Sequence, residues 1–260
     1  MRALVFVLAA ACCTLACAQQ GQVQFDRPWD DWEPPVLPAP EPNAYDLYRT
    51  AFDLLKDFEP PGDDATPQEL RDSIAGLGLA YYWLQQAMMG ECRFPPATAP
   101  DQSFPELAAA RNACRFMVTH AQVAALDGDM ARAALDCIAC VRIGAAAASN
   151  GTLVGGLVAA ACEAIGLRQL AEITSALQPA ECRLAIAALR QAQARRVSLA
   201  EVLRGELICG KITMKRLFAD MKTPEDIERT IAALAPEQRA QALEQWQQLQ
   251  QTGQLWTPAS

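Results

Sequence analysis

Cysteines are the residues of this chain whose type and spacing most directly suggest chemistry. Three of the ten lie within residues 1–18, and seven follow: Cys92, Cys114, Cys137, Cys140, Cys162, Cys182 and Cys209. Because seven is odd, at least one thiol stays unpaired or pairs with another chain. The open interpretations are a disulfide, a set of small core residues and a metal site.

Two of these thiols have a symmetric position in the sequence. Cys114 and Cys140 each lie 13 residues from Asp127, in the turn sequence Asp127-Gly128-Asp129. Apolar residues on both sides of that turn follow the helical period, which predicts two antiparallel helices. Such helices place Cys114 and Cys140 at the same height, so we expect these two to be the disulfide candidates. Cys162 reaches a similar height across the next turn and competes for the same partner.

The remaining nucleophile and ligand patterns do not form a known active site. Cys137 and Cys140 form a CxxC inside a helical pattern, without the strand that precedes a thioredoxin motif. His120 is the single histidine, lies near an apolar helical stripe and has no GxSxG sequence with it. We interpret His120 as structural and predict no catalytic residue, metal or cofactor. A thiol- or metal-handling protein remains an alternative, and would use Cys114, Cys137, Cys140 and His120.

Pairs of neighbouring carboxylates could support a second kind of chemistry, hydrolysis. The adjacent or near-adjacent carboxylates are Asp30-Asp31, Asp63-Asp64 and Asp127 with Asp129, all in linker or turn contexts where Asp serves caps and solvation. A hydrolase whose carboxylates meet in space is therefore an alternative function.

One long predicted helix carries several charges, which form either an anion site or, as we favour, a solvated face: Arg190, Arg195, Arg196, Glu201, Arg204 and Glu206.

The elements that must position these residues are all predicted to be helices. Period-3.6 apolar patterns follow Asn43, run from Thr66 to about Gly90, and flank the Asp127-Gly128-Asp129 turn. Further helices are expected over 152–176 and 179–208, and two more begin at Thr223-Pro224 and Ala235-Pro236. No alternating strand pattern of useful length occurs. The prediction is an all-α fold of about eight helices in antiparallel hairpins, as a helical bundle or a tetratricopeptide-like stack.

The N-terminus predicts export. Arg2, an apolar run and Ala16-Cys17-Ala18 make residues 1–18 a signal peptide, with Cys17 as the lipid-anchor candidate in a competing lipoprotein interpretation. Residues 19–42 form a proline-rich acidic linker, and 43–256 are expected to form a single domain. We expect a periplasmic or extracellular protein without a transmembrane span, because Ser149–Thr152 interrupts the uncharged stretch 143–162.

Two resemblances agree with this layout. Residues 124–135 resemble the turn of a tetratricopeptide hairpin, with Ala121, Ala133 and Cys140 where that family places small residues. The likeness covers one hairpin, and Ala145 stands at the family's terminal proline. The whole layout resembles uncharacterised exported α-helical bacterial proteins through Asn43-Ala44-Tyr45-Asp46, the Gly128-Asp129 hairpin and Arg204-Gly205-Glu206. That resemblance implies the fold and brings no assigned activity.

Composition narrows the function further. The chain has 260 residues, 52% of them hydrophobic, and a net charge of −8, which disfavours binding to nucleic acid. The function that we predict is a non-enzymatic exported helical scaffold or protein-interaction module, whose protein partner and oligomeric state the sequence does not specify.

Overall fold

The computed structural model describes residues 39–96, 104–219 and 224–251. Every regular element in these ranges is a helix, so the all-α prediction is confirmed. The predicted signal peptide, Cys17 and all but the last residues of the linker lie outside the described residues. The chain divides into two compact units, residues 35–212, and residues 1–34 together with 213–260. This division falls inside a helix, α9 (Leu199–Ala219), and the single domain expected over 43–256 stays a prediction.

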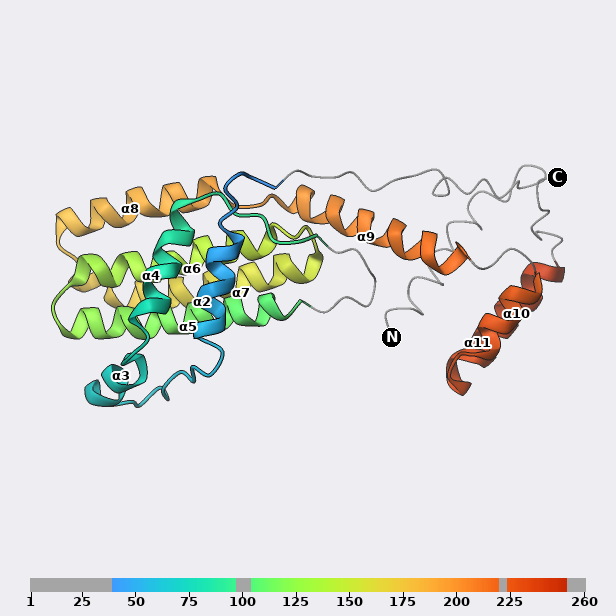
Figure 1. Cartoon of the computed structure of the whole chain (residues 1–260), viewed down its shortest axis with the longest axis horizontal. Helices are drawn as coiled ribbons and strands as arrows, with labels where there is room; N and C mark the ends of the chain where they lie inside the picture. Colours follow the sequence, from blue (N-terminus) through green and yellow to red (C-terminus); the bar gives the residue numbers. More distant parts are fainter. Residues whose placement is uncertain (1–38, 97–103, 220–223, 252–260) are drawn as a thin grey trace. The chain divides into compact units, whose positions relative to one another are not determined.

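Four long helices form the centre of the first unit: α5 (Pro105–Leu126), α6 (Met130–Ala148), α7 (Leu153–Ile173) and α8 (Pro179–Ala194). They lie alongside one another, and α6 contacts α5, α7 and α8 (Figure 1). Gly128 forms the α5–α6 turn with φ of +82°, a value that glycine adopts at little cost. Asp129 then caps α6 by accepting a hydrogen bond from the Arg132 amide at 3.0 Å. The predicted hairpin is therefore confirmed.

Small residues bring α6 and α7 close together. A methyl group at Gly166 would collide with the carbonyl oxygen of Cys137, and one at Gly144 would lie 2.9 Å from the Ala159 oxygen. Together with the following 3₁₀ turn, α7 (Leu153–Ala176) is long and apolar enough to cross a membrane. Core helices of soluble bundles meet the same criterion, and α7 packs along α5 and α6.

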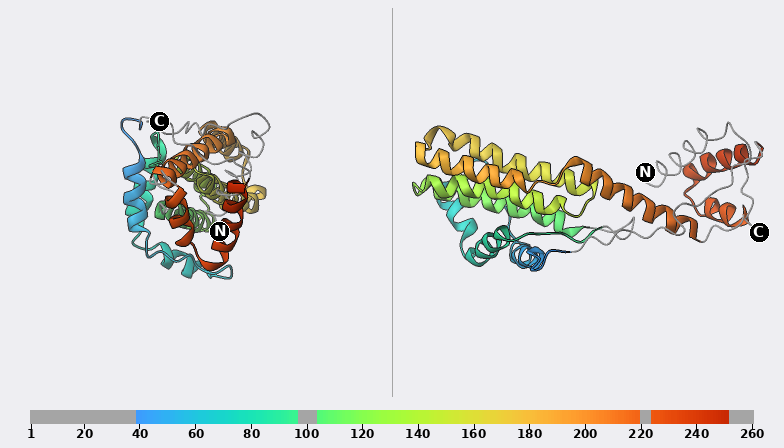
Figure 2. Two further views of the ribbon diagram at one scale, coloured as in Figure 1. Left: turned by 90° about the vertical axis from the view of Figure 1, so that its right-hand side faces the viewer. Right: turned by 90° about the horizontal axis from the view of Figure 1, so that it is seen from above.

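A second layer of shorter helices covers the bundle. Helices α2 (Tyr45–Leu54) and α4 (Gly78–Met89) lie across α5 and α6, and α3 (Pro67–Ile74) contacts α5 (Figures 1 and 2). Aromatic rings pack inside this layer, including those of Tyr48, Phe52 and Phe94. Asn43 joins the two ends of the layer, because its Oδ1 accepts hydrogen bonds from the Tyr45 and Arg93 amides at 3.1 and 3.0 Å.

Two predicted helices are each divided. The helix expected over 66–90 is α3 and α4, separated at Gly76, whose φ of +81° is incompatible with a continuing helix. The helix expected over 179–208 ends at Ala194, and α9 begins at Leu199. The side chains of Ser198 and Glu201 form a reciprocal capping box there, with bonds of 3.2 and 2.8 Å. The Ser-x-x-Glu signal for this break was present in the sequence.

The start of α9 is fixed on the α6–α7 turn. Val202 lies against Gly156, and Gly205 is in backbone contact with Gly151. The Glu206 carboxylate accepts a hydrogen bond from the Leu153 amide at 2.8 Å, at the beginning of α7. The Arg204-Gly205-Glu206 sequence is thus explained by packing, because Gly205 permits the approach and Glu206 caps a helix.

The second unit contains two described helices of its own. Helices α10 (Pro224–Ala232) and α11 (Pro236–Gln251) begin at the two predicted proline starts and contact one another. Ile231 and Trp246 are buried, and the Trp246 indole donates to Glu228 Oε1 at 3.4 Å.

Candidate functional site

A buried carboxylate on α6 is the centre of a polar cluster that joins three helices. The Asp136 side chain is 1% exposed. Its Oδ2 lies 2.8 Å from His120 Nδ1 on α5, and its Oδ1 accepts from the Tyr81 hydroxyl on α4 at 2.8 Å. Gln85 Nε2 lies 3.5 Å from the same Oδ1. A buried carboxylate needs such donors, so Asp136 ties three helices together at one point.

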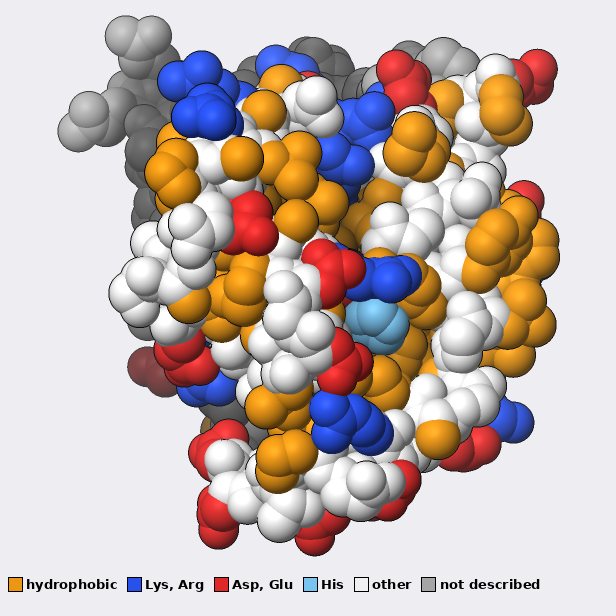
Figure 3. All heavy atoms as spheres, turned by 90° about the vertical axis from the view of Figure 1, so that its left-hand side faces the viewer, with side chains coloured by type: hydrophobic (Ala, Val, Ile, Leu, Met, Phe, Trp, Pro, Cys, Tyr) orange, Lys and Arg blue, Asp and Glu red, His pale blue; other side chains and the backbone are white. Residues whose placement is uncertain are grey.

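The histidine ring is held in one orientation. Because the Asp136 carboxylate can only accept, the hydrogen bond places the proton of a neutral His120 on Nδ1. The Tyr81 ring stacks on the imidazole with a centroid distance of 4.0 Å, and Arg132 Nε donates to the Tyr81 hydroxyl at 3.3 Å. The His120 side chain is 20% exposed and reaches the surface beside side chains of both charges (Figure 3).

Electrostatics in this cluster favour a protonated tyrosine. Burial, followed by the Asp136 charge, raises the pKa of Tyr81 to about 12. Tyr81 therefore donates to Asp136 throughout the neutral range. In its neutral form the imidazole has Nε2 as a hydrogen-bond acceptor, which is the geometry of a carboxylate-oriented general base. Among the described residues, the side chain of His120 is hydrogen-bonded to Asp136 and to no Ser, Thr or Cys that could act as a nucleophile.

The predicted cysteine pair is brought together. Cys114 and Cys140 are fully buried free thiols, and each Sγ lies near the carbonyl oxygen of the other residue, at 3.8 and 3.5 Å. Cys162 adjoins them. Burial, then hydrogen bonds with these two thiols, holds the pKa of Cys114 well above its usual value. Neutral thiols without solvent access are poor nucleophiles, and the disulfide between Cys114 and Cys140 stays a prediction.

The other metal-handling and hydrolase candidates are dispersed. Burial raises the pKa of Cys137, and this residue packs in a different core cluster from Cys140. Within the described ranges, no three His, Cys, Asp or Glu side chains are placed to hold a metal ion. Asp127 pairs with Arg71 at 2.6 Å, and Asp129 caps α6. Asp63 and Asp64 are exposed, and Asp30-Asp31 lies outside the described residues.

The charged residues predicted on one long helix are divided between two. Arg196 pairs with Glu163 at 2.8 Å, whereas Arg195 donates to the carbonyl oxygens of Met88 and Gly90 at the end of α4. Glu201 and Glu206 cap helix starts, and Arg190 and Arg204 are exposed. The solvated-face interpretation therefore holds for only part of the set.

An apolar row forms the most regular exposed feature of α9. Leu199, Leu203 and Leu207 are 68%, 52% and 61% exposed and are spaced four residues apart. Leu153 and Leu157 on α7 are 43% and 64% exposed. Leucines at i, i+4 and i+8 share one side of a helix, so α9 presents an apolar ridge.

Sequence reasoning did not identify Asp136 as part of a site. A signal was available, because His120 and Asp136 lie eight residues on either side of Gly128, the turn that also aligns the cysteines. A single acid within the apolar run 133–141 is the second signal, since an unpaired buried carboxylate is unfavourable.

Comparisons with protein-family models, with curated proteins and with solved structures found no match to this chain. The function is therefore inferred from the geometry of the described residues.

Proposed function

We propose that the chain is a non-enzymatic exported interaction module that binds an amphipathic helix of a partner protein along α9. The observation that carries this proposal is the row of Leu199, Leu203 and Leu207, each more than half exposed. Leucines repeated every four residues form a ridge that packs into the groove of another helix.

An exposed arginine beside the row supports an acid on the partner helix. The two acids nearest the row are engaged in capping, because Glu201 accepts from the Ser198 amide and Glu206 from the Leu153 amide. Arg204 is exposed and forms no ion pair with a carboxylate in the described part of the chain. A helix with leucines on one side complements this surface in shape, and a Glu or Asp placed opposite Arg204 would add one ion pair.

Contacts with the bundle hold the start of the ridge. The contact of Gly205 with Gly151, the packing of Val202 on Gly156 and the Glu206 cap attach the start of α9 to the bundle. A surface fixed before binding loses little conformational entropy when a partner arrives. This is the property expected of a scaffold.

Export is part of the proposal and rests on residues 1–18. Intact mass spectrometry of the exported chain distinguishes its two forms. A mass beginning at Gln19 indicates a secreted protein, and a mass beginning at a lipidated Cys17 indicates a membrane-tethered one. A chain that retains residues 1–18 would contradict processing.

A synthetic peptide tests the binding surface. The probe is a helical peptide with leucines at i, i+4 and i+8 and glutamates beside them, measured by fluorescence anisotropy. We expect Leu203→Asp to weaken its binding at least about tenfold, because a buried unpaired carboxylate opposes an apolar contact. The matched control is Leu126→Asp, which alters a 48% exposed leucine at the end of α5.

Two results would contradict a partner helix. Equal weakening by both substitutions removes the specific role of α9. A dimer of the chain itself that Leu203→Asp dissociates, measured by light scattering, makes a second copy the occupant instead.

General-base hydrolysis is a second candidate, favoured by the oriented His120–Asp136 pair. The test is hydrolysis of a p-nitrophenyl ester by the purified chain. Activity that is lost in His120→Gln and retained in Gln122→Ala, a substitution on the same helix, supports it. No hydroxyl or thiol in the described residues is hydrogen-bonded to His120. If the chain is an interaction module, the unaltered chain, His120→Gln and Gln122→Ala should therefore all hydrolyse the ester at the same background rate.

A further inference from the structure

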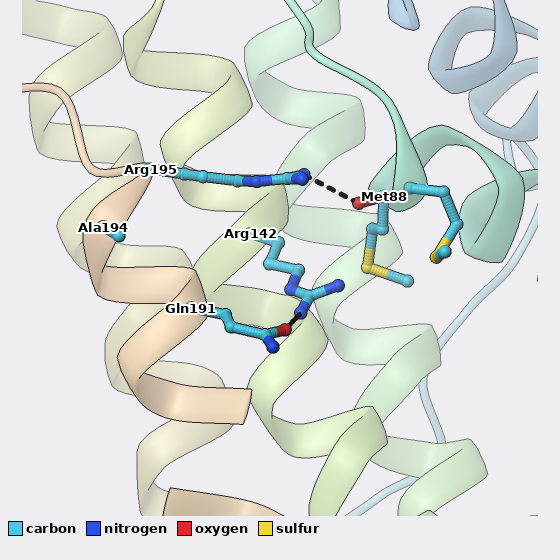
Figure 4. A pocket seen from close by; sticks show the side chains of 6 residues that line it. Met88, Arg142, Gln191, Ala194 and Arg195 are labelled. Carbon is cyan, nitrogen blue, oxygen red and sulfur yellow. Dashed lines mark hydrogen bonds between the residues drawn. The ribbon is translucent and has the colours of Figure 1, made fainter. Parts of the chain in front are cut away.

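A pocket of about 270 Å³ lies where α4, α6 and α8 meet. Met88 and Met89 line it from the end of α4, Arg142 from α6, and Gln191, Ala194 and Arg195 from the end of α8 and the residue after it. The side chains of Arg142, Gln191 and Arg195 extend in the same direction, toward the end of α4 (Figure 4). Two guanidinium groups and one amide therefore share a single small cavity with two methionines.

Neutral groups hold both arginines in place. Arg195 Nη1 donates to the carbonyl oxygens of Met88 and Gly90 at 2.9 and 3.2 Å. Arg142 Nη2 donates to Gln191 Oε1 at 3.2 Å. In the described part of the chain, each ion pair joins other residues, so no carboxylate neutralises either guanidinium. The carboxyl end of the α4 helix dipole offsets part of the positive charge of Arg195. It does not offset the charge of Arg142.

The two positive charges affect each other. Burial, followed by the charge of Arg195, lowers the pKa of Arg142. Like charges that face one cavity without a counter-charge are unfavourable by themselves and become favourable when an anion lies between them. Guanidinium groups bind carboxylate and phosphate oxygens through paired N–H donors, which a pair of lysines does not reproduce.

We propose that this pocket binds a small organic oxyanion, a carboxylate or phosphate group on an apolar body, between Arg142 and Arg195. The amide nitrogen of Gln191 supplies a further donor, because its oxygen already accepts from Arg142. Met88, Met89 and Ala194 contact the apolar body, and the flexible methionine side chains adapt to its shape. This site is separate from the leucine row of α9.

Calorimetric titration with three probes tests the proposal: phenyl phosphate, benzoate and inorganic phosphate. We expect saturable binding of at least one aromatic anion, with inorganic phosphate weaker because it has no apolar body. Binding of phenyl phosphate alone identifies a phosphate ester as the ligand class. Binding of benzoate as well extends the class to carboxylates. No saturable binding of any probe overturns the proposal.

Variants locate the binding. Arg142→Gln is expected to weaken the best probe at least about tenfold, since it removes a charge-assisted bidentate contact. Arg142→Lys keeps the charge but loses the paired donors. Its affinity for the probe should therefore lie between that of the unaltered chain and that of Arg142→Gln. Arg190→Gln is the matched control, because Arg190 is exposed on α8 and does not line the pocket. Equal losses in Arg142→Gln and Arg190→Gln would overturn the assignment.

A thermal measurement keeps the test independent of folding defects. The best probe should raise the melting temperature of the unaltered chain and of Arg190→Gln, and leave that of Arg142→Gln unchanged. An identical rise in all three proteins contradicts the pocket.

Discussion

Two of the charged side chains on helix α6, Asp136 and Arg142, are in opposite electrostatic situations. Asp136 is fully buried and has donors from two neighbouring helices, at 2.8 Å from both His120 and Tyr81. Arg142 lies six residues further along, about 9 Å by helical rise, and its partner is the neutral Gln191. The first charge is satisfied within the chain, and the second faces another arginine across a pocket. A satisfied charge fixes a fold, whereas an unsatisfied one is available to a ligand.

The largest expected effect is the loss of the satisfied charge. Asp136→Ala should lower the free energy of unfolding by about 3–5 kcal/mol, because His120 and Tyr81 are left without their buried acceptor. Urea unfolding measures this change, with the exposed Asp72→Ala as the control. A loss of unfolding free energy below about 1 kcal/mol would show that water replaces the carboxylate. The contrast between a satisfied Asp136 and an unsatisfied Arg142 would then fail.

The tyrosine of the same cluster should have a smaller effect. Tyr81→Phe should cost about 1–2 kcal/mol, since Asp136 loses one donor and keeps His120. The control is Tyr82→Phe, which alters a half-exposed ring on the same helix. Chemical unfolding of the two variants at neutral pH gives the difference, and equal costs would contradict the role of the Tyr81 hydroxyl.

Tyr81 also predicts a pH dependence. Its pKa of about 12 in the folded chain exceeds the usual value near 10, so the neutral form is favoured by folding. The contribution of neutral Tyr81 to the free energy of unfolding is complete below pH about 10 and is lost as the pH rises from there toward 12. Tyr81→Phe should therefore lose less stability over this range than the unaltered chain, as followed by circular dichroism. The same loss in both would assign the alkaline transition to other groups.

The smallest expected effect has the opposite sign. Arg142→Gln should leave stability unchanged or raise it by less than about 1 kcal/mol, because it relieves repulsion from the exposed Arg195. The effect should shrink at high salt, whereas that of Asp136→Ala should persist, since buried pairs are screened little. A large loss in Arg142→Gln would mean that Arg142 is as structurally necessary as Asp136, and the distinction between them would disappear.

Much of the fold could be predicted because local patterns specify it. The Asp127-Gly128-Asp129 turn and the apolar stripes on both sides predict the α5–α6 hairpin, and the same symmetry predicts that Cys114 and Cys140 meet. The divisions near Gly76 and Ser198 were missed, although each had a local signal. Continuous apolar periodicity outweighed those signals, since glycine and serine also occur within helices.

The candidate sites depended on contacts that no local pattern contains. Tyr81 and Asp136 are 55 residues apart, and Met88 and Arg195 are 107 apart. Both contacts form because α4 lies across the bundle, and the order of helices does not specify that packing. The charged residues of one predicted helix were expected to form a solvated face, with an anion site as the alternative. The pocket proposed here to bind an anion takes Arg195 from after α8 and Arg142 from α6.

The sequence by itself determined the helices, the central hairpin and the height at which its cysteines meet, because periodicity, caps and turns act between residues close in the chain. The tertiary structure alone decided which charges are satisfied. Whether Asp136 finds donors, and whether Arg142 finds a carboxylate, depends on the crossing of α4 and the placement of α8, which the packing of whole helix faces determines.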